Sequence, residues 1–224
     1  MRTFEELLDE KDPAWPQILQ WKEAAVNNVE LLPADETKAR EALYSIQVTT
    51  RSLLGAVAYH SGGILIDDGW IRILGSGHPR LPRNLPDWNL GKTFQEYGMR
   101  PAWWLVADDA IGGFFAVNGG YFGTDTLGAV YYFGPDTLEW ENLDMTYTSF
   151  VMFCFQGDVA GFYEGYRWEG WQADVVALPG DQTFMMLPPL WTKEGKNIQT
   201  NQRTAIPVEE MYGVSMDFSR QATR

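Results

Sequence analysis

Residues 103–117 read WWLVADDAIGGFFAV, and residues 129–141 read AVYYFGPDTLEWE. These stretches contain four runs rich in aromatic and β-branched residues, as strands usually are. The runs are Trp103–Ala107, Gly113–Val117, Ala129–Phe133 and Leu138–Glu141, and the turns between them are Asp108-Asp109, Asn118-Gly119-Gly120 and Gly134-Pro135-Asp136. Short turns can join consecutive strands only when these run antiparallel, so the spacing predicts an antiparallel meander.

A hairpin precedes the meander. Ile64–Ile66 and Trp70–Leu74 flank the turn Asp67-Asp68-Gly69, and an Asp-Gly step between two β-rich runs is a strong hairpin signal. Between the hairpin and the meander, residues 75–100 contain several prolines and basic side chains. We interpret them as a long surface loop with a short helix near Lys92–Glu96.

Helices are predicted where apolar residues recur at helical spacing. They are expected over residues 15–26, 34–47, 52–60, 148–156 and 207–218. Together the elements predict an α+β fold, with N-terminal helices packed on a mainly antiparallel sheet of roughly five or six strands and a C-terminal extension. We expect a single domain with a helical part over 1–62, a mixed sheet over 63–160 and the extension over 161–224.

The negative charge of the chain is concentrated in its second half. Between Pro101 and Thr192 one basic residue, Arg167, stands against twelve acidic ones, and the whole chain has a net charge of −13. The acidic residues are Asp108, Asp109, Asp125, Asp136, Glu139, Glu141, Asp144, Asp158, Glu164, Glu169, Asp174 and Asp181. Such a surface repels nucleic acid and anionic lipid and attracts basic proteins. The alternative is an internal salt bridge between the basic 75–100 loop and the acidic half.

The compartment is inferred from what the sequence lacks. Residues 1–9 do not contain the apolar stretch of a signal peptide, and no apolar run approaches the roughly twenty residues that span a bilayer. We therefore expect a cytoplasmic protein. The single cysteine, Cys154, lies among apolar neighbours, which predicts a buried thiol with a raised pKa.

Several short motifs are compatible with chemistry, but each has a simpler explanation. Asp67-Asp68 could bind a divalent cation or form an acid and base pair, although an Asp-Asp-Gly turn accounts for both residues. Gly75-Ser-Gly-His78 lacks the lysine and spacing of a phosphate-binding loop. His60 and His78 have no cysteine near them, so we predict no metal and no cofactor. Packing accounts for Cys154 better than nucleophilic catalysis does, and no serine elbow is present.

Tryptophans beside carboxylates suggest one alternative function. Glu139-Trp140-Glu141 and Trp168-Glu-Gly-Trp171 could form a sugar-binding platform, because aromatic rings stack on sugar faces while carboxylates bind hydroxyls. The same residues are also compatible with cross-strand pairs on the solvated face of a sheet.

Two blocks of sequence resemble a bacterial family of unknown function, DUF 2625. They are residues 43–55, LYSIQVTTRSLLG, and residues 64–78, ILIDDGWIRILGSGH. A wider resemblance is to the SUKH superfamily, through Gly62-Gly63, the strands from Trp103 to Glu141, and Ser149-Phe150. Many SUKH proteins are immunity partners of bacterial toxins, so this resemblance implies a SUKH-like fold and a noncatalytic protein-binding role.

These observations lead to a prediction of function. We expect a noncatalytic protein that presents an acidic, aromatic-bearing surface to a basic protein partner, such as a toxin. We expect it to bind neither nucleic acid nor membranes. Two tryptophans are expected to supply apolar anchoring and four carboxylates to supply charge. The predicted partner-binding residues are Trp104, Asp108, Asp109, Glu139, Trp140 and Glu141. A carbohydrate-binding or carbohydrate-processing protein is the alternative.

Overall fold

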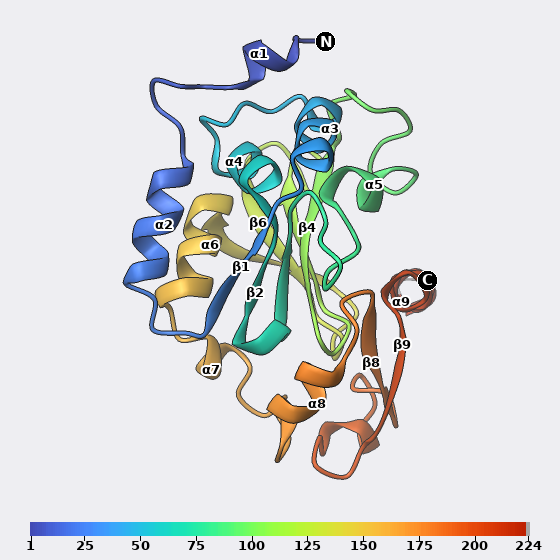
Figure 1. The fold of residues 1–224 in the computed structure, drawn as a ribbon. Helices are drawn as coiled ribbons and strands as arrows, with labels where there is room; N and C mark the ends of the chain where they lie inside the picture. Colours follow the sequence, from blue (N-terminus) through green and yellow to red (C-terminus); the bar gives the residue numbers. More distant parts are fainter. Residues whose placement is uncertain (223–224) are drawn as a thin grey trace.

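A seven-stranded antiparallel sheet forms the centre of the computed structural model, which describes residues 1–222 (Figure 1). The strands are neighbours in the order in which they occur in the chain. They are β1 (Val29–Pro33), β2 (Ser61–Ile66), β3 (Ile71–Leu74), β4 (Trp103–Asp109), β5 (Phe114–Asn118), β6 (Ala129–Phe133) and β7 (Trp140–Thr146). The predicted hairpin and meander are therefore parts of one continuous sheet, and the α+β class is confirmed.

Helices and a second hairpin surround this sheet. The helices are α1 (Phe4–Leu7), α2 (Trp15–Glu23), α3 (Glu36–Ile46), α4 (Leu53–His60), α5 (Leu85–Asn89), α6 (Tyr147–Gln156), α7 (Val159–Phe162), α8 (Trp171–Ala177) and α9 (Val208–Ala222), with 3₁₀ turns η1 (Asp67–Gly69) and η2 (Glu194–Lys196). Strands β8 (Gln182–Leu187) and β9 (Gln202–Pro207) pair with each other. Side-chain caps fix several helix starts: Asp35, Ser52 and Thr146 each accept a hydrogen bond from a backbone amide three residues further on.

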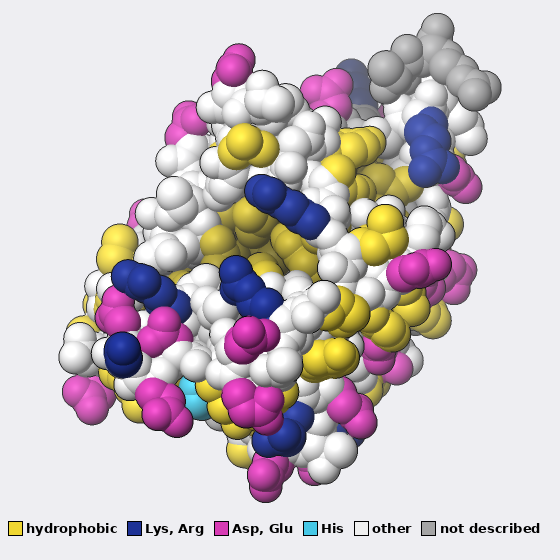
Figure 2. All heavy atoms as spheres, turned by 90° about the horizontal axis from the view of Figure 1, so that it is seen from above, with side chains coloured by type: hydrophobic (Ala, Val, Ile, Leu, Met, Phe, Trp, Pro, Cys, Tyr) yellow, Lys and Arg dark blue, Asp and Glu magenta, His cyan; other side chains and the backbone are white. Residues whose placement is uncertain are grey.

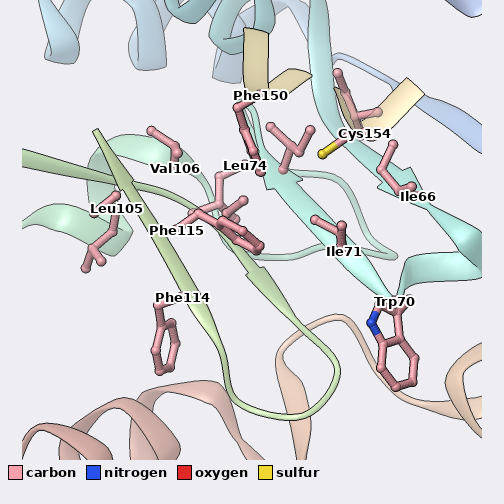
Figure 3. Packing of buried hydrophobic residues seen from close by; sticks show 14 of the residues in the cluster. Ile66, Trp70, Ile71, Leu74, Leu105, Val106, Phe114, Phe115, Phe150 and Cys154 are labelled. Atoms are coloured by element: carbon pink, nitrogen blue, oxygen red, sulfur yellow. The ribbon is translucent and has the colours of Figure 1, made fainter. Parts of the chain in front are cut away.

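The two faces of the sheet are covered by different parts of the chain. Adjacent residues of a strand point to opposite faces, and Phe114 and Phe115 show this in β5 (Figure 3). Phe115 packs on Phe150 of α6, with ring centroids 4.7 Å apart. Phe114 packs on Tyr212 of α9, at 5.2 Å. In Figure 1, accordingly, α2 and α6 lie on one side of the sheet, and β8, β9 and α9 lie on the other.

The structure corrects three predicted elements. Residues 1–62 are not uniformly helical, because Val29–Pro33 forms β1, whose buried Val29 and Leu32 give too short a pattern to be recognised. The helix predicted over residues 34–47 begins only at Glu36, because Pro33 is still the last residue of that strand. The predicted short helix at Lys92–Glu96 is wrong; the loop instead contains α5, where Asn84 caps the helix and Pro86 lies in the first turn.

Candidate functional site

Three of the six predicted partner-binding residues lie in the interior. Asp108 and Asp109 are almost completely buried, and Trp104 is 8% exposed and packs on Phe94. The prediction that these three form a binding surface is therefore wrong. The reason is that β4 continues to Asp109, where a turn was expected, so that Asp108 pairs with Arg72 of β3 inside the sheet.

Asp108 is neutralised by two arginines. The Nε atom of Arg72 donates to one carboxylate oxygen at 2.6 Å, and Arg83 of the 75–100 loop donates to the other. The same arginines donate to the backbone carbonyls of Gln182 and Gly180, at the start of the β8–β9 hairpin. Burial lowers the pKa of Arg72, and the charge of Asp108 opposes that shift. The network therefore joins the C-terminal extension to the sheet.

Asp109 is held by hydrogen bonds alone. The hydroxyls of Tyr132 and Tyr163 donate to Oδ2 at 2.8 and 3.0 Å, and the amides of Ile111 and Gly113 donate to Oδ1 at 3.0 and 2.7 Å. Burial raises the pKa of Asp109, while these hydrogen bonds act in the opposite direction. Four donors occupy the carboxylate of Asp109, and its bonds to Ile111 and Gly113 close the β4–β5 turn.

The other short motifs also have structural roles. The amides of Ser76, Gly77 and His78 donate to the carbonyls of Ser61, Gly62 and Leu81, so this loop offers no free cradle for phosphate. Burial raises the pKa of the Cys154 thiol, as predicted. Within residues 1–222 no group of three or more His, Cys, Asp or Glu side chains is placed to hold a metal ion.

Arg167 fills a cluster of aromatic rings, which we name the arginine-filled cluster: Trp70, Tyr163 and Trp171. Its guanidinium carbon lies 4.1 Å from the ring centroid of Trp171 and 5.0 Å from that of Trp70. It also forms an ion pair with Asp67 of η1, at 2.6 Å. Figure 3 shows Trp70 where the chain enters β3, next to Ile71.

The second predicted sugar-binding platform, Trp168-Glu-Gly-Trp171, is part of this packing. Trp168 is buried, and its Nε1 atom donates to Asp174 at 2.6 Å. Trp171 is half-buried between Trp70 and Arg167. Neither ring presents an open face beside a free carboxylate, so the Trp168–Trp171 segment does not form an exposed platform.

A second set of rings covers one end of the sheet beside α9. We name it the outer aromatic cluster: Trp103, Tyr121, Phe122, Tyr131 and Trp140. Trp103 stacks on Tyr121 with ring centroids 4.9 Å apart and meets Trp140 edge-on at 5.1 Å. Phe122 stacks on Tyr131 at 4.1 Å. Tyr121 is 60% exposed, so the cluster is open to solvent.

Carboxylates lie at the rim of the outer aromatic cluster. Asp125 precedes Thr126, whose hydroxyl lies 2.9 Å from that of Tyr131. Asp144 accepts a hydrogen bond from Asn142, which is the cross-strand partner of Tyr131. Both carboxylates are exposed, and the ion pairs of residues 1–222 include neither of them.

The other three predicted binding residues, Glu139, Trp140 and Glu141, do not all lie on the same face as the outer aromatic cluster. Trp140 is half-buried inside the outer aromatic cluster, and exposed Glu139 precedes it. Glu141 is exposed but is the cross-strand partner of Tyr132, so its side chain points to the opposite face. A sequence signal for the cluster existed in the aromatic residues Tyr121 and Phe122 near the end of β5, but they lie in a loop that only the fold brings onto Trp103.

On the face seen in Figure 2, the negative charge is not continuous. Asp and Glu side chains are interspersed there with Lys and Arg around a hollow with a hydrophobic floor. Ion pairs between Arg80 and Glu30 and between Lys92 and Glu209 add to the neutralisation of Asp108 by Arg83. The alternative prediction, that the basic loop pairs internally with the acidic half, is confirmed for Arg83 and Asp108.

One apolar pocket was not predicted. It has a volume of about 230 Å³ and lies between the β8–β9 hairpin and α9. Its walls include Ile111, Met185, Leu190, Trp191, Met211 and Phe218. These side chains are apolar, so they offer packing contacts to whatever enters the pocket.

Comparison with known proteins identifies the family. A family model described as "Protein of unknown function DUF2625" matches residues 4–211. An uncharacterized protein of Haemophilus influenzae is 43% identical over 212 residues, which is 95% of this chain and 92% of that protein. The uncharacterized protein YbfG of Escherichia coli strain K12 is 42% identical over 224 residues, the full length of both chains. These relatives do not test the SUKH resemblance, which stays a prediction. No helix within residues 1–222 is long and apolar enough to cross a membrane. The chain belongs to the DUF2625 family.

Proposed function

We propose that this protein is a noncatalytic binding domain whose outer aromatic cluster contacts a basic protein partner in the cytoplasm. The observation that carries the proposal is the combination of exposed Tyr121 with the unpaired rim carboxylates of Asp125 and Asp144. Aromatic rings give a large contact area, and unpaired carboxylates attract a basic partner and orient it. β7 is also an edge strand, paired only with β6.

The noncatalytic part of the proposal rests on how the reactive groups are used. Asp108 is paired with two arginines, and Asp109 accepts four hydrogen bonds. Cys154 is buried, and its raised pKa keeps the thiol protonated at neutral pH. These groups are therefore committed to the fold and not available to a substrate.

The SUKH resemblance extends the proposal to the kind of partner. If the relationship holds, the partner is a toxin that this protein neutralises. A basic toxin would suit the unpaired carboxylates, and the net charge of −13 disfavours nucleic acid and anionic membranes as targets.

Site-specific crosslinking tests the proposed surface. A photoreactive phenylalanine analogue replaces Leu127, which is 55% exposed and follows Thr126, or replaces Val176 on α8 as a control that is 68% exposed. We expect a basic protein from the native cell to crosslink at position 127 and not at 176. The yield should fall at high ionic strength and in the double variant Asp125→Asn/Asp144→Asn. Equal crosslinking at both positions would exclude the outer aromatic cluster as the binding surface.

A carbohydrate is the second candidate ligand, because Tyr121 stacks on Trp103 and is 60% exposed, and a sugar face can pack on such a ring. An oligosaccharide that stacks on Tyr121 should quench tryptophan fluorescence, and Tyr121→Ala should abolish the quenching. A ligand of this kind would bind independently of salt, which separates it from a basic protein.

A further inference from the structure

The apolar pocket beside α9 is lined on one side by a single face of that helix. The lining residues have the spacing i, i+3, i+4 and i+7, which brings side chains to the same side of a helix. They are Met211, Val214, Ser215 and Phe218. Strand β8 and the segment after it form the other side, with Met185, Met186, Leu187, Pro189, Leu190 and Trp191. The pocket therefore lies within the C-terminal extension, where α9 lies beside β8 and β9 (Figure 1).

The pocket has a buried interior and an open edge. Ile111, Leu190 and Met211 are buried in its interior, whereas Leu187 and Phe218 are exposed at its edge. Its volume of about 230 Å³ exceeds the roughly 150 Å³ of an apolar cavity that binds benzene. A small molecule can therefore enter from the solvent and be largely enclosed.

The chemistry of the walls selects the kind of molecule. Among the described residues, those that line the pocket carry no charged side chain. An ion that entered would lose its hydration without gaining a partner, so the ligand should be uncharged. Methionine lines the pocket at three positions, and thioether sulfur makes favourable contacts with aromatic rings while the flexible side chain adapts to their shape. Trp191 and Phe218, with ring centroids 5.2 Å apart, add two rings to the wall.

We infer that this pocket binds a small uncharged aromatic molecule of about two fused rings. The size follows from the volume, which is about one and a half times that of a cavity filled by the single ring of benzene. The inference goes beyond the proposed function and does not depend on it, because the pocket shares no lining residue with the outer aromatic cluster.

Methionine-methyl NMR of the full chain tests this inference, because a bound aromatic ring shifts the resonances of the methyl groups beside it. The probe is naphthol, compared with the anion naphthoate and with the open-chain octanol. We expect naphthol to shift the methyl resonances of Met185, Met186 and Met211 and to saturate them with a Kd below about 1 mM. Met152, exposed on α6, should stay unchanged. Naphthoate should bind at least about tenfold more weakly, and octanol about threefold more weakly.

A substitution that fills the pocket provides the second measurement. Val214 is half-buried on the α9 face that lines the pocket, so Val214→Phe should weaken naphthol binding at least about fivefold. Val176→Phe is the matched control, because it makes the same change at an exposed position of α8 outside the pocket, and it should keep the affinity. The methyl spectrum of each variant without naphthol shows whether it is folded.

Four outcomes would overturn the inference. If the three methionines show no saturating shifts in the natural protein, the pocket does not bind the aromatic probe, whatever the variants do. Equal binding of naphthoate would exclude selection for an uncharged ligand, and tighter binding of octanol would indicate a hydrocarbon chain in place of an aromatic ring. Unchanged naphthol affinity in a folded Val214→Phe variant would place the probe elsewhere on the protein. None of these outcomes bears on the outer aromatic cluster, which the crosslinking at position 127 tests separately.

Discussion

The arginine-filled cluster and the outer aromatic cluster contain the same kinds of side chain but differ in how their charge is balanced. In the first, Arg167 lies between Trp171 and Asp67. Within residues 1–222, its Nε atom and the Nε1 atom of Trp70 are the buried polar atoms of this cluster that have no hydrogen-bond partner. In the second, Tyr121 is exposed and the carboxylate of Asp125 has no ion pair among the residues that the structure describes. The first holds the fold together, whereas the second is the surface that we propose for a partner.

The same contrast applies to the acidic residues. At the junction with the C-terminal extension, Asp108 is compensated by Arg72 and Arg83, so its charge contributes to stability and not to the surface potential. In β7, the exposed carboxylates of Glu141 and Asp144 form no ion pair within residues 1–222. Substitutions at the junction should therefore change stability, and those at the outer aromatic cluster should change binding.

The largest effect is expected from Asp108→Asn. The substitution leaves two buried guanidinium groups without a counter-ion, and breaking a buried ion pair by removing one partner costs about 3–5 kcal/mol. The free energy of unfolding, measured by urea denaturation, should fall by that amount. Asp125→Asn is the matched control and should change it by less than about 0.5 kcal/mol. If the two variants lost equal stability, Asp108 would not be a buried, ion-paired carboxylate in contrast to exposed Asp125.

Arg167→Ala should have the next largest effect, a loss of about 2 kcal/mol, because the guanidinium is shielded from solvent and contacts both rings and a carboxylate. Arg167→Lys should lose less, since the charge remains while the planar stacking is lost. Thermal and urea unfolding measure both changes. Arg51→Ala is the control, because its ion pair with Asp12 is fully solvated. A loss no larger than in that control would remove the structural role of Arg167.

Much of the fold could be predicted from the sequence. The meander and the hairpin carry strong local signals, and the predicted helices at α4, α6 and α9 are confirmed. The strands β1, β8 and β9 were missed because their burial patterns are short and irregular. The formation of these strands depends on contacts with segments distant in the sequence, and a local sequence pattern carries no information about such contacts.

The site was less predictable, because burial of a charge depends on its partner. Asp108 and Asp109 looked like surface residues in a turn, yet Arg72 gave a signal. It lies between Ile71 and Ile73 in a predicted strand, and a cation inside a buried strand requires a counter-ion. The strand pairing supplies Asp108 directly opposite it. Glu139 and Trp140 were placed near the right surface, because the β6–β7 turn that presents them was predicted.

Asp109→Asn tests how the interior tolerates a carboxylate that has hydrogen bonds but no directly bound cation. Burial raises the pKa of Asp109, so between about pH 4 and that raised value the folded protein binds the proton more tightly than the unfolded chain does. The contribution of Asp109 to stability is therefore greatest near pH 4 and falls as the pH rises, by about 1.4 kcal/mol for each unit of the shift.

The asparagine variant lacks this titration. Unfolding free energies of both proteins, measured from pH 4 to pH 8, should show the advantage of the aspartate decreasing as the pH rises. An advantage that increases with pH would mean that the four hydrogen bonds favour the ionised form by more than burial disfavours it.

Tyr121→Ala should have the smallest effect on stability and the clearest effect on binding. An exposed ring that stacks on one face of Trp103 loses little when removed, and we expect a change in unfolding free energy of about 0.5 kcal/mol. The same variant should lose most of its crosslinking at position 127. On this expectation the exposed ring of Tyr121 contributes little to the stability of the protein. If instead Tyr121→Ala destabilised the protein as much as Arg167→Ala does, the outer aromatic cluster would be part of the core, and its exposure would not indicate a partner.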